Sequence, residues 1–196
     1  MIDRREIRGN FTLIDGVILK SGRLAFCALF DAAWDQGVKV AVLLYCDLDG
    51  TWTRGPDFNL EPVSIAESTS NHSNVWLLGR EGEIVRTDHG ESIQFVDETQ
   101  SVPGPFRKIR NIKDGLFVLG EDRSVWKRSS VSWMRLGSPG HGPTIQVDEF
   151  NEDAVLQAAI DETEVAFGIA GVNSESICLV GTGGRIWMWD DNNWFQ

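Results

Sequence analysis

The sequence predicts an all-β protein, and three observations carry that prediction. Apolar residues make up 42% of the 196 residues, which is enough to build a hydrophobic core. Eight tryptophans and ten phenylalanines fall mostly in short apolar runs, and aromatic residues favour strands. Twenty glycines punctuate those runs, as tight turns between strands require.

A strand–turn–strand unit recurs along the chain. It begins with an apolar run that ends in a glycine. A turn position lies three residues after this glycine, and a hydrophobic residue lies six residues after it. These positions are filled by Gly79, Gly82 and Val85, by Gly120, Arg123 and Trp126, and by Gly181, Gly184 and Trp187. A more divergent copy consists of the run Val40–Cys46, the turn Asp47–Gly50 and Trp52.

Four copies of this unit predict a small or partial β-propeller of about four blades, because stacked repeats bury the apolar face that each leaves uncovered. The units span about residues 11–60, 61–100, 105–137 and 164–196 of a single domain, 1–196. Their predicted first strands are Leu24–Phe30, Pro62–Ala66, Phe106–Ile112 and Val165–Val172. A further strand, Phe11–Leu19, either completes a blade from the other end of the chain or covers an open edge.

An insertion of residues 137–164 precedes the last blade. Its first part is rich in glycine and proline, which favours a loop. Asn151 then begins the only helix that the sequence predicts, since Val155, Leu156 and Ile160 fall on one face at helical spacing.

The run Ile186-Trp187-Met188-Trp189-Asp190 resembles the strand end of WD40-type repeats. The glycine-turn-Ile-Trp pattern is similar to the WD40/YVTN/BNR-like propeller repeats of bacterial proteins. This resemblance covers roughly residues 40–196 and implies the architecture, but it transfers no functional residue. Four blades form either a closed ring or an open arc that is completed by dimerisation or by a partner.

Catalytic chemistry is not indicated. His72, His89 and His141 lie in polar turn segments, and no metal-ligand or nucleophile motif surrounds them. The four aspartates Asp31, Asp35, Asp47 and Asp49 form the one carboxylate group from which a hydrolase could be built. The sequence therefore predicts a protein that is not an enzyme, with no catalytic residues, no metal and no cofactor.

Charge is distributed unevenly along the chain, whose net charge is −11. The window from Leu136 to Gly184 has no Lys or Arg, whereas Pro103–Gly137 is net basic. The acidic window is either a solvated surface or a docking surface that steers a basic protein. The predicted partner-binding residues are Asp148, Glu149, Glu152, Asp153, Asp161, Glu162 and Glu164. Nucleic acid is excluded as the main ligand, because phosphate binding needs concentrated positive charge.

Three tryptophans, Trp34, Trp76 and Trp189, fall outside the repeat positions and are predicted to make exposed contacts. Neither a signal peptide nor a membrane-spanning run is found, and three cysteines lie in apolar runs, so we expect a cytoplasmic protein with reduced thiols.

The sequence thus predicts a non-catalytic protein-binding module. By analogy, a small acidic module of this kind resembles an immunity protein that blocks a basic toxin domain such as a nuclease. Two alternatives are a propeller that binds carbohydrate or another small ligand, and a scaffold whose open edge is completed by a partner or by a homodimer.

Overall fold

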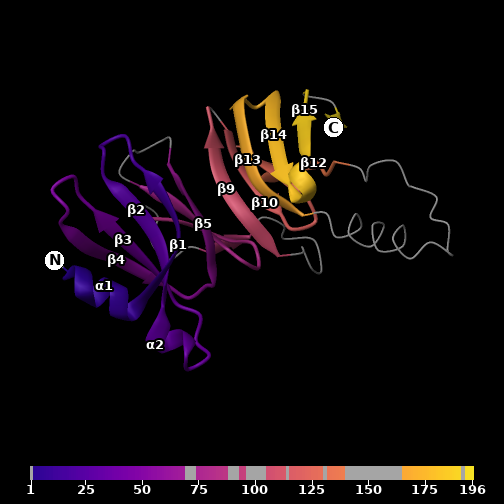
Figure 1. Cartoon of the computed structure of the whole chain (residues 1–196). Helices are drawn as coiled ribbons and strands as arrows, with labels where there is room; N and C mark the ends of the chain where they lie inside the picture. The colour runs from indigo at the N-terminus through magenta and orange to yellow at the C-terminus, as the bar shows by residue number, and fades with distance from the viewer. Residues whose placement is uncertain are drawn as a thin grey trace.

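Four antiparallel sheets of four strands follow one another along the chain (Figure 1). The computed structural model describes residues 2–68, 74–87, 93–95, 105–113, 115–129, 132–139, 165–190 and 193–196. Within each sheet the strands are hydrogen-bonded in chain order. This arrangement confirms the predicted all-β partial propeller.

The elements are named as in Figure 1. Sheet A consists of β1 (Phe11–Ile18), β2 (Leu24–Phe30), β3 (Ala41–Cys46) and β4 (Trp52–Phe58). Sheet B consists of β5 (Pro62–Glu67), β6 (Val75–Gly79), β7 (Glu83–Arg86) and β8 (Ile93–Phe95). Sheet C consists of β9 (Phe106–Ile112), β10 (Gly115–Gly120), β11 (Val125–Arg128) and β12 (Trp133–Gly137). Sheet D consists of β13 (Ala166–Asn173), β14 (Ser176–Gly181), β15 (Ile186–Trp189) and β16 (Trp194–Phe195).

The core lies between the sheets, which pack face to face in chain order. One buried apolar cluster joins A to B, a second joins B to C, and a third joins C to D. The recurring hydrophobic position of the repeat supplies one anchor to each: Val85, Trp126 and Trp187 all pack toward the preceding sheet. Sheets B and C are therefore apolar on both faces, as stacked sheets must be.

The repeated turn position has the same backbone conformation in every copy. Gly50, Gly82 and Gly184 have φ of 82°, 94° and 73°, and Arg123 occupies the same position with φ of 65°. This left-handed conformation strongly favours glycine. Arg123 adopts it with its guanidinium 5.7 Å from the centre of the Trp187 ring, so its side chain packs against the last sheet.

The prediction for the first strand of the first repeat was wrong by one strand. Leu24–Phe30 is the second strand of sheet A, and β1 takes the place that β5, β9 and β13 take in the other sheets. The divergent glycine turn misled the alignment, because Gly50 joins β3 to β4 whereas Gly82 joins β6 to β7. The β2–β3 connection of sheet A contains a helix instead of that turn.

Two short helices, α1 (Arg4–Asn10) and α2 (Asp31–Trp34), were not predicted. Asp3 caps α1 by accepting a 2.8 Å hydrogen bond from the amide of Arg5. Ile7 of α1 is buried against sheet A, so tertiary packing stabilises a helix that is too short to persist alone. The helix predicted from Asn151 lies outside the described residues, as do the three histidines.

Candidate functional site

The outer face of sheet D, turned away from sheet C, is the strongest candidate for a binding surface. Directly paired residues of an antiparallel sheet lie on the same face. Cys178 pairs with Met188, Val180 with Ile186, and Met188 with Phe195. Gly168 and Ala170 of β13 pair with Val180 and Cys178 and complete this face.

These seven residues, Gly168, Ala170, Cys178, Val180, Ile186, Met188 and Phe195, define the outer face of sheet D. None of them is charged. Val180, Ile186 and Phe195 are 43%, 52% and 50% exposed. The alternating residues Ile177, Leu179 and Trp187 point the other way and are buried against sheet C. Sheet D is thus apolar on both faces, although only one is covered by the described residues.

Sheet A, at the other end of the arc, has a covered outer face (Figure 1). Ile7 of α1 packs on Phe11, Ala28 and neighbouring apolar residues of this face. Ile2 forms a β-bridge with Trp52 at its edge. The Arg54 guanidinium lies 5.5 Å and 5.6 Å from the ring centres of Phe11 and Phe30. A helix and a cation therefore cover part of this apolar surface, whereas Leu13 and Ile18 on the same face are 45% and 70% exposed.

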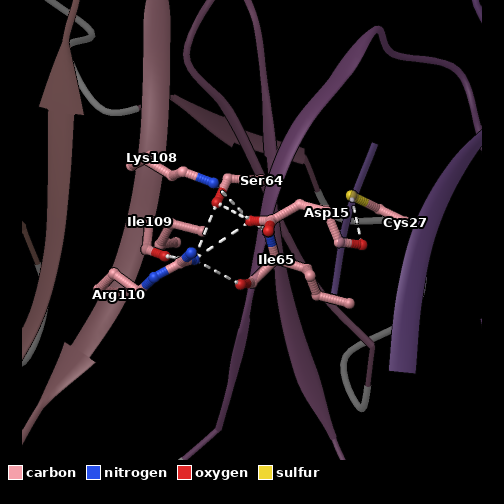
Figure 2. Close-up of polar contacts among 7 residues, drawn as sticks. All are labelled: Asp15, Cys27, Ser64, Ile65, Lys108, Ile109 and Arg110. Atoms are coloured by element: carbon pink, nitrogen blue, oxygen red, sulfur yellow. Dashed lines mark hydrogen bonds and ion pairs between the residues drawn. The ribbon is translucent and has the colours of Figure 1, made fainter. Parts of the chain in front are cut away.

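A polar cluster joins the first strands of sheets A, B and C (Figure 2). Asp15 of β1 directs Oδ2 at Ser64 of β5, whose hydroxyl donates a 2.6 Å hydrogen bond. Lys108 and Arg110 of β9 each place a nitrogen 3.2 Å from the same oxygen. Arg110 also donates to the carbonyl oxygen of Ile65. One carboxylate therefore links three successive sheets.

Burial raises the pKa of Asp15, but the hydrogen bonds from Ser64 and Arg110 and the nearby cations outweigh it and lower this pKa below its ordinary value. Asp15 is consequently ionised at neutral pH. The Cys27 thiol beneath it donates to the Asp15 carbonyl, and burial raises the pKa of Cys27 to about 12. The ionised carboxylate is held by two cations and a hydroxyl, and the thiol is unreactive. We therefore call Asp15, Ser64, Lys108 and Arg110 the inter-sheet clamp.

The basic residues of Pro103–Gly137 are largely engaged within the molecule. Besides Lys108 and Arg110 in the clamp, five cations lie over aromatic rings: Arg107 over Phe167, Arg123 over Trp187, Lys127 over Phe117, Arg128 over Trp76 and Arg135 over Trp126. Burial and the charge of Arg86 lower the pKa of Arg128. The basic stretch thus supports packing both within sheet C and between sheets.

The acidic residues predicted to bind a partner, Asp148, Glu149, Glu152, Asp153, Asp161, Glu162 and Glu164, lie outside the described residues.

Trp34, on α2, is 45% exposed. Trp76 and Trp189 were wrongly predicted to be exposed and are only 8% and 9% exposed. Arg86 and Arg128 cover Trp76. The ring centres of Trp189 and Trp194 lie 5.3 Å apart on the inner face of sheet D. Both faces of each sheet are apolar, so departure from a repeat position does not imply exposure.

The carboxylates considered for catalysis do not converge. Asp31 and Asp35 lie at α2, beside the start of β3, whereas Asp47 and Asp49 lie in the turn after its end. A strand of this length separates the pairs by roughly 20 Å. Asp31 accepts a hydrogen bond from Thr12, and Asp47 pairs with Arg23. Among the described residues, no three His, Cys, Asp or Glu side chains are grouped to hold a metal.

Sequence searches find neither a protein-family model nor a curated protein that matches the chain. Solved structures do match. A chain in a nidogen/laminin complex aligns over 94% of this chain with a TM-score of 0.61 and 12% identity. A luciferin-regenerating enzyme covers all of it with a TM-score of 0.58 and 13% identity. The β-propeller domain of Cps50 (Swd1) from Myceliophteria thermophila covers 92%, with a TM-score of 0.58 and 12% identity.

These similarities establish the β-propeller fold. The chain spans 62%, 60% and 54% of those three structures respectively, which is less than two thirds of each. One of the three is an enzyme and another is a chain in a protein complex, so the fold alone does not choose between catalysis and binding. No helix in the described part of the chain is long and apolar enough to span a membrane.

Proposed function

We propose that this chain is a non-catalytic protein-binding module whose partner presents basic residues. The observation that carries the proposal is the internal use of its own positive charge. Lys108 and Arg110 are directed at Asp15, and Arg107, Arg123 and Arg128 lie over aromatic rings. In the part of the chain that the structure describes, much of the positive charge is thus directed at internal partners, and the chain as a whole carries a net charge of −11.

Such a surface favours encounter with a cationic protein, because complementary potentials raise the association rate and suppress wrong partners. The window from Leu136 to Gly184 concentrates acidic side chains and has no Lys or Arg. More specifically, we propose that the module acts as an immunity-type inhibitor that blocks a basic toxin domain. The acidic residues of the insertion would then imitate nucleic-acid phosphates.

The test compares two baits that carry the same change of net charge. One has Glu152, Asp153, Asp161 and Glu162 replaced by Lys. The control has the exposed residues Glu6, Asp35, Asp49 and Glu175 replaced by Lys. Wild-type protein immobilised at low salt is challenged with host lysate, and each retained protein is purified and its affinity for all three baits measured.

We expect a basic protein that binds wild type and control alike and whose affinity falls steeply with salt. Its affinity for the insertion variant should fall at least about 100-fold, since several charge pairs of 1 kcal/mol or more would be reversed. Equal binding to all three baits, or retention of acidic proteins only, would contradict the proposal.

A further inference from the structure

We propose that α1 is a hinged strap, which opens and closes over the outer face of sheet A while the sheet itself stays folded. The first step is the small buried contact of this helix. Ile7 is 6% exposed and packs against the cluster that contains Phe11 and Val42, whereas Arg5 and Arg8 are exposed. A seven-residue helix is too short to persist alone, so α1 stays in place only through its contacts with the sheet.

The second step is how the strap is fastened. At its start, the amide of Ile2 donates a 2.9 Å hydrogen bond to the carbonyl oxygen of Trp52, at the edge of sheet A. Asp3 then caps the helix through the amide of Arg5. Both contacts lie outside the strand ladders of the sheet, so they can break while every strand stays paired. At its end, α1 runs directly into β1 at Phe11, which is the hinge (Figure 1).

The third step is the contrast with the sheet beneath. Strand β3 is hydrogen-bonded to β2 on one side and to β4 on the other, and its residues Val42 and Leu44 are fully buried. Segments with few buried contacts open at a lower free energy than densely packed strands. The strap therefore opens before the sheet does, and its opening uncovers apolar residues around Val42. These residues are separate from the acidic insertion, so the inference is independent of the proposed function.

Hydrogen–deuterium exchange of the full chain, resolved by peptide mass spectrometry, tests the inference. Amides of residues 4–10 should be protected, but they should exchange at least about 100-fold faster than those of β3. The experiment is repeated in urea below the unfolding transition. Exchange of the strap should hardly respond to urea, because its opening exposes little surface, whereas exchange of β3 should accelerate steeply.

Two substitutions at exposed positions of the strap shift its opening in opposite directions. D3A removes the helix cap and should accelerate exchange of the strap about tenfold. G9A raises helix propensity, and the described residues leave open space for the added methyl group, so it should slow exchange about threefold. The matched control is D49A, which removes an equivalent 2.8 Å hydrogen bond from the amide of Thr51 in the turn after β3. It should leave exchange of the strap unchanged.

The exchange of β3 serves as the check on folding in every variant, so a misfolded protein is not mistaken for an open strap. A common exchange rate for residues 4–10 and β3 overturns the inference, because the strap and the sheet would then open together. Strap amides that exchange as fast as an unfolded peptide also overturn it, because the strap would then not close. The same holds if D3A accelerates β3 as much as the strap, or if D49A accelerates the strap as much as D3A does.

Discussion

The two ends of the arc are built from similar sheets and finished differently. Sheet A receives Ile7 from α1 and the guanidinium of Arg54 on its outer face, whereas Val180 and Ile186 of sheet D stay exposed. An apolar face that is covered within the chain contributes to folding, and one that is left open is available for association. The difference indicates that α1 and Arg54 stabilise one end of this propeller, whereas the described residues leave the outer apolar face of the other end uncovered.

The largest expected effect tests the covered end. Replacing Ile7 with Ala should lower the free energy of unfolding by about 2–4 kcal/mol, because a buried aliphatic side chain leaves a cavity between α1 and sheet A. Urea denaturation followed by tryptophan fluorescence measures the change. A loss no greater than that of I186A would show that α1 does not stabilise the sheet it covers.

The next effect concerns the clamp, which ties together sheets A, B and C without a residue from sheet D. Asp15→Asn should destabilise the protein by about 1–3 kcal/mol at neutral pH, since it removes a charge that faces Lys108 and Arg110. Because folding lowers the pKa of Asp15, its ionised form contributes stability above the ordinary value of 3.8, and this contribution is lost as the pH falls through the lower folded value.

Denaturation of wild type and D15N from pH 7 to pH 2 checks this sign. The difference in unfolding free energy should be constant near neutrality and should shrink only below about pH 4. A difference that grows toward acid would contradict the account, and S64A serves as the comparison that removes one hydrogen bond but keeps the charges.

A smaller effect tests the cation on the outer face of sheet A. Arg54→Ala should cost about 0.5–1 kcal/mol, because it exposes the rings of Phe11 and Phe30 and removes two cation–π contacts. Thermal unfolding at low and moderate salt measures it. Arg54→Lys keeps the charge and should recover part of the loss. Arg54 also forms an ion pair with Asp57, and no loss in either variant would mean that the contacts of Arg54 with the two rings do not stabilise the fold.

The smallest effect belongs to the open end. Ile186→Ala should change the stability of the dilute monomer by less than about 0.5 kcal/mol, since half of the side chain is already in water. A loss of 2 kcal/mol or more in dilute protein would show that the face is covered within a single chain.

The sequence predicted the fold class because the repeat combines a turn position of fixed backbone conformation with a regularly spaced hydrophobic residue. A left-handed turn position recurs at Gly82, Arg123 and Gly184, and the hydrophobic position that follows anchors each inter-sheet core. The first sheet was misaligned because its glycine turn lies one hairpin later. Burial of Trp76 and Trp189 was missed for a different reason, since a residue outside the repeat positions can still face an inter-sheet core, as both of these do.

The sites were harder to predict. Asp15, Ser64 and Arg110 come from three separate units, and no spacing in the sequence brings them together. The outer face of sheet D could not be recognised either, because Val180 and Ile186 resemble the residues of any internal sheet. Only the packing order of the sheets, which places sheet D at an end, shows that no described residue covers this apolar face.

Cysteine alkylation tests the contrast between the two ends most directly. Cys178 lies on the outer face of sheet D, Cys46 lies on the outer face of sheet A, and Cys27 is buried between sheets. Iodoacetamide labelling of wild-type protein, resolved by peptide mass spectrometry, gives a rate for each thiol at low and high protein concentration.

The account predicts that Cys178 reacts readily at both protein concentrations, because no described residue covers the outer face of sheet D. Cys27 should stay unreactive throughout, because its raised pKa leaves almost no thiolate. A Cys178 rate as slow as that of Cys27 would contradict the claim that the outer face of sheet D is uncovered, whereas the outer face of sheet A is partly covered by α1 and Arg54.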